Sequence, residues 1–427
     1  MAQSLNLLST LSRVETPFIK IQIGKYVFGV YDKKFKKQGQ DVYGTFRLNG
    51  ITYPNFVKSL SITKINGTVN TYNLEMFYQI GHGDDPNFFE KVFSSVSDTR
   101  KIIFSYGDLS MPYDFSYRDE EAIIMDIKTQ FNVMSAALTY RITAISTGKL
   151  STIGNYTFPA TYDKPSNVLK KMIKNNQYGI TDLFYGMRNY QQVIQSGCIL
   201  DDDQKVPLEL KTNVSILEYI SYLVNNMVQL GITSASVNKG PVYTMCIVDD
   251  TSGEFGGPYL KINKVSASQM YSEAYDIDIG YPSNNVVTDF SVDDDQTYSI
   301  FYKYNNELHQ NEYVQRINDE GQIEEIYAPV ISSSNDSHIT KNEDKAWWTR
   351  VTQYPIKATI TLKGLLRPAI LMTSVRLNVY YFGRKHVSSG LYIVTKQEDT
   401  VNEQGFRTKL SLLRVSDIEM EDEKYVN

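Results

Sequence analysis

The sequence predicts an α+β protein that is mainly β, with a helix-containing middle domain inserted between two β-rich ends. Apolar and polar residues alternate over much of the first 146 positions and again from about residue 258, which is the period of half-buried strands. Past Pro165 the apolar residues recur instead at helical spacing. The dipeptide Asn66-Gly67 lies between two alternating runs and favours a tight hairpin, because both residues tolerate positive φ angles.

The first region, residues 1–150, is expected to hold five or more strands and one helix. Alternation begins at 18–23, and the run FVKSLSITKINGTVNTYNLEMFYQI, residues 56–80, predicts a long antiparallel hairpin. A helix is expected over 85–96, because Asp85 can cap it and the next residue is a proline suited to a first turn. Three further strands are expected at the segments 101–106, 121–127 and 137–145.

The middle region, residues 151–257, begins with a loop-rich boundary and is expected to contain two helices. The first helix has an apolar face formed by Val168, Leu169, Met172 and Ile173. The second is expected over 215–230, because Ser215 and Glu218 have the spacing of a capping box and Gly231 suits a C-terminal stop. These helices distinguish the middle region from the β-rich ends.

Strands return in residues 258–345 and in a final block, residues 346–418. The strands expected before the final block are the segments 259–265, 274–281, 285–292, 296–304 and 312–317. The polar segment 328–344 predicts an exposed loop, and in the run PIKATITLKG, residues 355–364, strict alternation predicts a strand with one buried face. The acidic tail, residues 419–427, is expected to fray.

Composition limits the possible functions. The chain has 427 residues, of which 42% are hydrophobic and 21% charged, so it should fold throughout into about two to four domains. A net charge of −5 disfavours tight binding of nucleic acid, which requires a positive surface. The N-terminus has no basic signal-peptide region, and no window approaches the apolar length of a membrane span. Cys198 and Cys246 have no metal-binding spacing and are expected to be buried free thiols.

The motifs predict no catalytic, cofactor-binding or metal-binding residue, so we do not expect an enzyme. The histidines lack the partner spacing of a zinc site or a catalytic triad and are expected on the surface or in loops. They are His82, His309, His338 and His386. Asp-Asp-Asp-Gln occurs at 201–204 and at 293–296 without the pattern of a calcium loop and predicts solvated turns. The glycine-rich segments 81–83 and 253–257 lack nucleotide-binding spacing and predict loops.

Glycines separate the strands of the C-terminal block, residues 347–415. One strand ends at Gly364, and a stretch with Pro368 and Leu371 leads into the strand 376–381. The runs Ser389-Gly390-Leu391-Tyr392-Ile393-Val394 and Gly405-Phe406-Arg407-Thr408 follow. This order resembles the C-terminal β-domain of phage tail baseplate hub proteins, a group shared with contractile injection systems. The structural positions that the resemblance marks are Gly364, Gly383, Ser389, Gly390, Tyr392, Gly405 and Thr408, and a glycine there suits a turn or a bulge.

The resemblance implies two tube-like antiparallel β-barrels, the first of which contains the Asn66-Gly67 hairpin. Such hubs are homotrimers, so that six barrel-like units join a six-fold tail tube to a three-fold central spike. The implied partners are the tail tube protein, the central spike protein, the tape measure protein and other baseplate proteins, with DNA only in transit and no membrane. The resemblance also implies assembly in the host cytoplasm and a place in the tail baseplate of the virion, and a contractile tail is preferred to a non-contractile one. Because the motifs indicate no binding site, no cofactor is expected. Three copies carry 3 × (−5) = −15 charges, which predicts acidic positions on the loops that line the channel.

Two other functions fit the strand content. A virion-surface protein that binds a carbohydrate or a receptor would expose an aromatic platform, for which Trp347-Trp348 is the candidate pair. An enzyme with two carboxylates brought together by the fold would need no sequence motif. The 32 tyrosines suit half-buried strands and also contacts between subunits.

Overall fold

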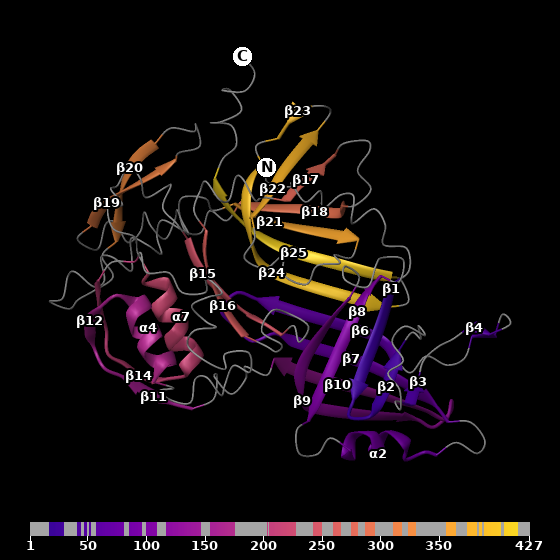
Figure 1. Cartoon of the computed structure of the whole chain (residues 1–427). Coiled ribbons are helices and arrows are strands. Elements are labelled where there is room, and N and C mark those ends of the chain that lie inside the picture. The colour runs from indigo at the N-terminus through magenta and orange to yellow at the C-terminus, as the bar shows by residue number, and fades with distance from the viewer. Residues whose placement is uncertain are drawn as a thin grey trace, which may run out of the picture.

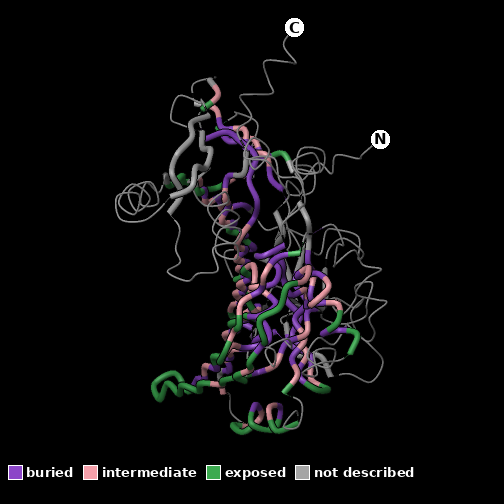
Figure 2. Tube along the Cα trace, turned by 90° about the vertical axis from the view of Figure 1, so that its left-hand side faces the viewer, coloured by how far each residue is buried: buried purple, intermediate pink, exposed green. Residues whose placement is uncertain are grey.

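Strands dominate the computed structural model of the chain, and one large sheet runs through most of it (Figure 1). The elements form a first β-unit, a middle unit with two helices and a second β-unit, each with an apolar core. Buried positions extend along the length of the molecule, and exposed ones gather at its lower end (Figure 2). The structure describes residues 17–29, 41–43, 47–48, 51–52, 57–80, 85–95, 100–108, 117–146, 154–175, 203, 205–227, 242–249, 259–265, 275–280, 287–294, 311–317, 323–329, 356–363, 374–381, 384–386, 388–402 and 405–416.

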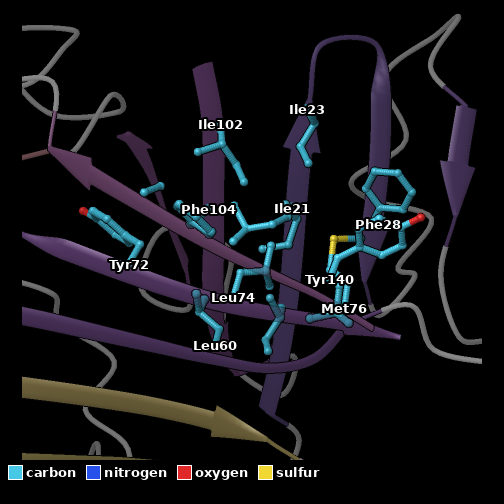
Figure 3. Close-up of a cluster of buried hydrophobic side chains, with 14 of the residues drawn as sticks. Ile21, Ile23, Phe28, Leu60, Tyr72, Leu74, Met76, Ile102, Phe104 and Tyr140 are labelled. Carbon is cyan, nitrogen blue, oxygen red and sulfur yellow. The ribbon is translucent and has the colours of Figure 1, made fainter. Parts of the chain in front are cut away.

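The first β-unit contains the described strands from β1 to β10 and helix α2. The strands are β1 (Pro17–Ile23), β2 (Tyr26–Gly29), β3 (Asp41–Tyr43), β4 (Arg47–Leu48), β5 (Ile51–Thr52), β6 (Val57–Ile65), β7 (Thr71–Gln79), β8 (Lys101–Asp108), β9 (Tyr117–Asn132) and β10 (Ala137–Ser146). Alternate residues form one core, in which the rings of Tyr72 and Phe104 stack with centroids 4.8 Å apart (Figure 3). Helix α2 (Phe88–Ser94) buries Phe89 and Val92 in this core.

The middle unit packs two helices against short strands. Its elements are β11 (Tyr156–Phe158), β12 (Thr161–Asp163), α4 (Pro165–Lys174), β13 (Val206–Leu208), β14 (Lys211–Val214), α7 (Ile216–Asn225), β15 (Val242–Val248) and β16 (Tyr259–Val265). The expected capping box is present, because the Glu218 N–H donates to Ser215 Oγ and the Ser215 N–H donates to the Glu218 carboxylate. Strand β15 belongs to two cores: Met245 lies in that of the middle unit, and Cys246 in that of the second β-unit.

The second β-unit holds the remaining strands of the large sheet. They are β17 (Tyr275–Ile279), β18 (Val287–Asp294), β21 (Ile356–Lys363), β22 (Ser374–Tyr381), β23 (Arg384–Lys385), β24 (Gly390–Asn402) and β25 (Gly405–Ser416). Ala358, Ile360 and Leu362 of β21 are buried, as the alternation predicts. Strands β19 (Asn311–Ile317) and β20 (Ile323–Pro329) form a separate antiparallel pair.

Fifteen strands in the described part of the chain form a single sheet that includes both β-units. Its main path runs β18-β21-β25-β24-β6-β7-β10-β9-β8-β1-β2-β3, and β22 joins β17 and β23 to β24. The pairs β17–β22 and β2–β3 are parallel, and the other pairs of this sheet are antiparallel. The two β-units therefore meet edge to edge at β6 and β24.

Most of the expected elements that the structure describes are confirmed, with corrections. Helix α2 begins at Phe88 rather than at 85, because Asp85 Oδ1 accepts a hydrogen bond from the Asn87 N–H in a turn before the helix. Helix α7 ends at Asn225 rather than at 230, where the Asn226 side chain bonds a backbone carbonyl of the last turn.

Two further corrections concern strands. The large sheet is not wholly antiparallel, since β17–β22 and β2–β3 are parallel pairs. The sequence did not predict this, because residue alternation is the same beside a parallel neighbour and an antiparallel one. Strand β20 extends to Pro329, so the first two residues of the expected loop 328–344 belong to a strand. The rest of that loop, the expected strand 296–304 and Gly231 lie outside the described residues.

Candidate functional site

The three units meet at one place, which we call the junction. It includes the β6–β24 pair, whose strands lie side by side in Figure 1. It also includes the Asn66-Gly67 turn and a set of buried polar side chains, which we call the polar cluster. The members of the polar cluster are Lys64, Asn70, Tyr72, Tyr106, Glu120, Ser146, Asp249, Gln397, Asp399 and Thr408.

Strand β24 changes its partner in mid-strand. Residues 390–393 pair with β22, and residues 396–401 pair with β6. The change falls at an irregularity between Val394 and Lys396, where the register with β25 skips one residue. Such a bulge bends a strand and increases its twist. One strand therefore belongs to the second β-unit at one end and pairs with the first β-unit at the other.

The Asn66-Gly67 turn occupies the point where the three units meet. The Asn66 N–H donates to the carbonyl of Thr395 in β24 at 3.1 Å, and the Gly67 N–H donates to that of Met245 in β15 at 2.9 Å. Gly67 has a φ of +76°, a left-handed conformation that glycine adopts without strain. The expected hairpin turn is confirmed, and its two amides bond both neighbouring units.

A buried ion pair lies at the centre of the polar cluster. Lys64 Nζ of β6 lies 2.5 Å from Glu120 Oε1 of β9, and the two side chains are 7% and 2% exposed. Lys64 also donates to the Tyr106 hydroxyl at 3.3 Å, which donates to Glu120 Oε1 at 2.9 Å. Removing one partner of such a pair leaves a buried charge uncompensated, which costs about 3–5 kcal/mol.

Asp249 connects the middle unit to the polar cluster. Its Oδ2 lies 2.8 Å from Asn70 Nδ2 and 2.9 Å from the Tyr72 hydroxyl oxygen, and its Oδ1 lies 2.5 Å from Ser146 Oγ. Its backbone carbonyl accepts from the Glu121 N–H at 3.0 Å. Asp249, the residue that follows β15, therefore forms hydrogen bonds with strands β7, β9 and β10 of the first β-unit or with residues next to them.

Asp399, in the second β-unit, lies close enough to Lys64 for that charge to lower the pKa of its carboxyl group. Its Oδ1 accepts from the Thr408 hydroxyl at 2.6 Å, and its Oδ2 accepts from the Gln397 amide at 2.7 Å. Gln397 pairs directly with Lys64 in the β6–β24 register. A slip of β24 by one residue would turn these side chains to the opposite face of the sheet, so the polar cluster specifies one register.

Burial and neighbouring charges shift the pKa values of this cluster. Burial by itself lowers the pKa of Lys64, but the surrounding carboxylates, with Glu120 first, outweigh it and raise that pKa. Burial raises the pKa of Asp249 to about 7, against the hydrogen bonds that its carboxylate accepts. Burial also raises the pKa of Asp399 to about 6, although Lys64 lowers it. The pKa of Tyr72 lies well above its ordinary value because of burial and the two nearby carboxylates.

The positions marked by the family resemblance do not converge on one site. Ser389 Oγ bonds the backbone of Val379, and the Tyr392 hydroxyl donates to a backbone carbonyl at 2.7 Å. Gly390 and Gly405 begin β24 and β25, and Thr408 belongs to the polar cluster. Gly364 and Gly383 lie outside the described residues. The role of this set as a family-specific motif stays a prediction.

Sequence analysis missed the charged members of the polar cluster, although the sequence carries one signal of them. Lys64 shares the buried face of β6 with Leu60 and Ile62, and Asp399 shares that of β24 with Val401. A charge on an otherwise apolar face is rarely buried without a partner. The partners themselves come from distant segments, and the pattern does not identify them.

The other candidate residues have separate locations. Asp203 is buried rather than solvated, because its carboxylate accepts hydrogen bonds from the N–H and the hydroxyl of Ser166 at the start of α4. Asp293 is exposed but belongs to β18 rather than to a turn. His386 is exposed, as expected, and Cys246 is buried. The other candidates lie outside the described residues: His82, His309, His338, Cys198, Trp347-Trp348 and the segments 81–83 and 253–257.

In the part of the chain that the structure describes, no group of His, Cys, Asp and Glu side chains is arranged to hold a metal ion. None of the helices described there combines the length and the apolar character needed to cross a membrane.

No protein-family model and no curated protein matches the chain, whereas several solved structures are similar to it. The tail protein from Neisseria meningitidis MC58 has 8% identity and a TM-score of 0.48, over 94% of this chain and 97% of that one. The prophage MuSo2 tail protein from Shewanella oneidensis has 9% identity and a TM-score of 0.46, over 94% and 97%. The E. coli c3393 protein, a type VI secretion component, has 8% identity and a TM-score of 0.41, over 86% and 75%.

The first two of these structures are tail proteins, and the third is a type VI secretion component. The resemblance expected from residues 347–415 is to proteins of the same kinds. At such identities and TM-scores the similarity assigns neither an activity nor a partner to this chain.

Proposed function

We propose that this chain is a structural protein of a phage-type tail, a hub whose three copies present six β-units around a channel. The observation that supports the proposal is the continuous sheet, in which one chain joins two β-units edge to edge through β6 and β24. A ring of three chains needs one kind of contact between copies, repeated by the symmetry. A ring of six β-units has six contacts between neighbouring units. Three of them are the contacts between copies, and the β6–β24 contact inside each chain supplies the other three.

The outer strands of the sheet support the same proposal. Strands β18 and β3 lie at the two ends of the main path of the sheet. Among the described strands, β18 pairs with β21 alone and β3 pairs with β2 alone. An unpaired strand edge is a site where another chain can add a strand. We propose that the β18 edge of one copy meets the β3 end of the next copy and so closes the ring.

The finer features of the proposal follow from the family resemblance. Each β-unit is a tube-like barrel, and the divisions near residues 150, 257 and 345 separate the domains. The ring joins a six-fold tail tube to a three-fold central spike in a contractile tail, and the tape measure protein and DNA occupy its channel in turn. Acidic loops line that channel. The protein works without catalysis and is assembled in the host cytoplasm into the virion baseplate.

Mass in solution tests the number of copies. Light scattering is expected to give 3 × 48.8 = 146.4 kDa, and electron microscopy a closed ring with three-fold symmetry. Val292→Lys, at a 38% exposed position on β18, should weaken the trimer. Val133→Lys, in the exposed β9–β10 turn, is the matched control and should not. A chain that stays monomeric, even when mixed with the tube and spike proteins, contradicts the proposal.

The alternative, a carbohydrate- or receptor-binding protein of the virion surface, has a direct test. Binding of the isolated protein to a glycan array, lost on Trp347→Ala, would favour it over the hub. Turnover of cell-wall material that depends on single acidic residues would instead favour an enzyme.

A further inference from the structure

The hydroxyl of Tyr72 lies between two buried carboxyl groups. Its oxygen is 2.8 Å from Glu120 Oε2 and 2.9 Å from Asp249 Oδ2. A phenol hydroxyl carries one proton, so it donates to one of these two oxygens at a time. The other contact is a hydrogen bond only when that carboxyl group itself carries a proton. In Figure 3 the oxygen of Tyr72 points away from the apolar side chains of the core.

The surroundings of the two acids identify the one that is protonated. Glu120 forms the ion pair with Lys64 and also accepts from Tyr106, which are the surroundings of a carboxylate. Asp249 is 2% exposed, and the side chains hydrogen-bonded to its carboxyl group, those of Asn70, Tyr72 and Ser146, are neutral. Burial among neutral partners favours the protonated acid.

The charge balance of the polar cluster leads to the same assignment. Its ten side chains include three carboxyl groups, those of Glu120, Asp249 and Asp399, and one lysine. If all were ionised, the charge would be 1 − 3 = −2 in a buried volume. Like charges that share a buried site raise one another's pKa, so the cluster retains at least one proton.

We propose that the junction is a proton-binding site, in which Asp249 Oδ2 carries a proton at neutral pH and donates it in a hydrogen bond to Tyr72, which donates to Glu120. Asp249 belongs to the middle unit, whereas Tyr72 and Glu120 belong to the first β-unit. This chain of hydrogen bonds therefore holds the two units together. When the proton leaves, one contact of Tyr72 loses its hydrogen and a second negative charge faces Glu120. The inference does not depend on the number of copies in the assembly.

The pH range over which folding stability changes follows from the pKa values of Asp249 and of the titratable groups around it. The pKa of Asp249 is about 7 in the folded chain against an ordinary 3.8, so between these values the folded chain binds more protons than the unfolded one. Stability therefore falls as pH rises from about 4 to about 7 and stays lower above that range. Asp399, with a pKa of about 6, acts in the same direction over a lower range. Lys64, with a raised pKa, contributes stability that is lost only above its ordinary value of 10.5. Tyr72 and Tyr106 are the other titratable groups of the cluster.

Urea unfolding of the full chain between pH 5 and pH 9 tests the proposal. The wild type should lose stability between pH 6 and pH 8, and Asp249→Asn should reduce that loss by at least half, because an amide is neutral at every pH. At pH 8 the variant's urea midpoint should lie above that of the wild type. Asp126→Asn, an exposed position on β9, is the matched control and should keep the wild-type dependence. Equal pH dependence of the wild type and Asp249→Asn would overturn the proposal.

Two measurements on the wild type keep the test decisive if Asp249→Asn does not fold. Infrared spectra should contain the carbonyl band of a protonated carboxyl group at pH 6, and this band should be lost by pH 9; its absence at pH 6 would overturn the proposal. Hydrogen exchange of the Glu121 amide, which bonds Asp249 O, should also accelerate over this range, after correction for intrinsic rates. The Leu74 amide, within the β7–β10 ladder, should not follow it.

Discussion

The two ends of β24 have different surroundings although they belong to one strand. Tyr392 and Val394 lie in the apolar core of the second β-unit, with no exposed surface. Gln397 and Asp399 lie in the polar cluster, where Gln397 donates to Asp399 and Asp399 also accepts from Thr408. Apolar packing tolerates rearrangement, whereas a buried hydrogen-bond network accepts one arrangement. The comparison indicates that the apolar end contributes stability and that the polar end selects the partner strand and its register.

Among the substitutions at the two ends of β24 and their partners, removal of Lys64 is expected to lower stability the most. In Lys64→Ala, Glu120 stays buried without its cation, so the free energy of unfolding at pH 7 should fall by about 3–5 kcal/mol. The loss should grow with pH, because the remaining carboxyl groups repel one another as they ionise. Urea unfolding at several pH values measures both effects.

Lys58 provides a matched control on the same strand. Its ion pair with Glu75 has a distance of 3.1 Å, but the lysine side chain is 53% exposed. Lys58→Ala should therefore cost about 0–1 kcal/mol. If Lys64→Ala lowered the free energy of unfolding no more than this control does, the polar cluster could not select the partner strand of β24 or its register.

The structure of β6 and β7 could be predicted from the sequence because their determinants are local. The hairpin depends on alternation and on the Asn66-Gly67 turn, and the start of α7 on the capping box formed by Ser215 and Glu218. The contact between β6 and β24 could not be predicted in this way. Asn66 and Val394 meet across the junction although 328 positions separate them. Alternation within β24 is the same whether its neighbour is β6 or β22.

The polar cluster could be predicted only in part. A lysine in step with Leu60 and Ile62 indicates a buried cation, and therefore a buried acid. The sequence contains 48 acidic residues, and no local pattern distinguishes Glu120 or Asp249 from the others. These acids reach Lys64 through the order of the strands and the loop after β15, which are properties of the whole fold.

Truncation at the apolar end of β24 should have an intermediate effect. Val394→Ala removes two methyl groups from a fully buried site, so it should cost about 2 kcal/mol in unfolding free energy. The cost should be the same at pH 5 and at pH 8, because the lost groups carry no charge. Val133→Ala, at a 79% exposed site in the β9–β10 turn, should change stability by less than about 0.5 kcal/mol. A cost that changed with pH would show that the two ends of β24 are coupled.

The smallest expected effect is a difference, between two pH values, in the strength of one hydrogen bond within the polar end. Thr408→Val keeps the shape of the side chain but removes the hydroxyl that donates to Asp399 Oδ1 at 2.6 Å. Above its pKa of about 6, Asp399 is charged and this bond is worth about 1.5–3 kcal/mol, against about 0.5–1.5 kcal/mol when the acid is neutral. The loss of stability should therefore be larger at pH 8 than at pH 5. Thr400→Val, on the opposite face of β24, should show no such difference. A loss for Thr408→Val that is equal at both pH values would mean that Asp399 does not ionise between pH 5 and pH 8. The stability of the polar end would then not depend on the charge of Asp399.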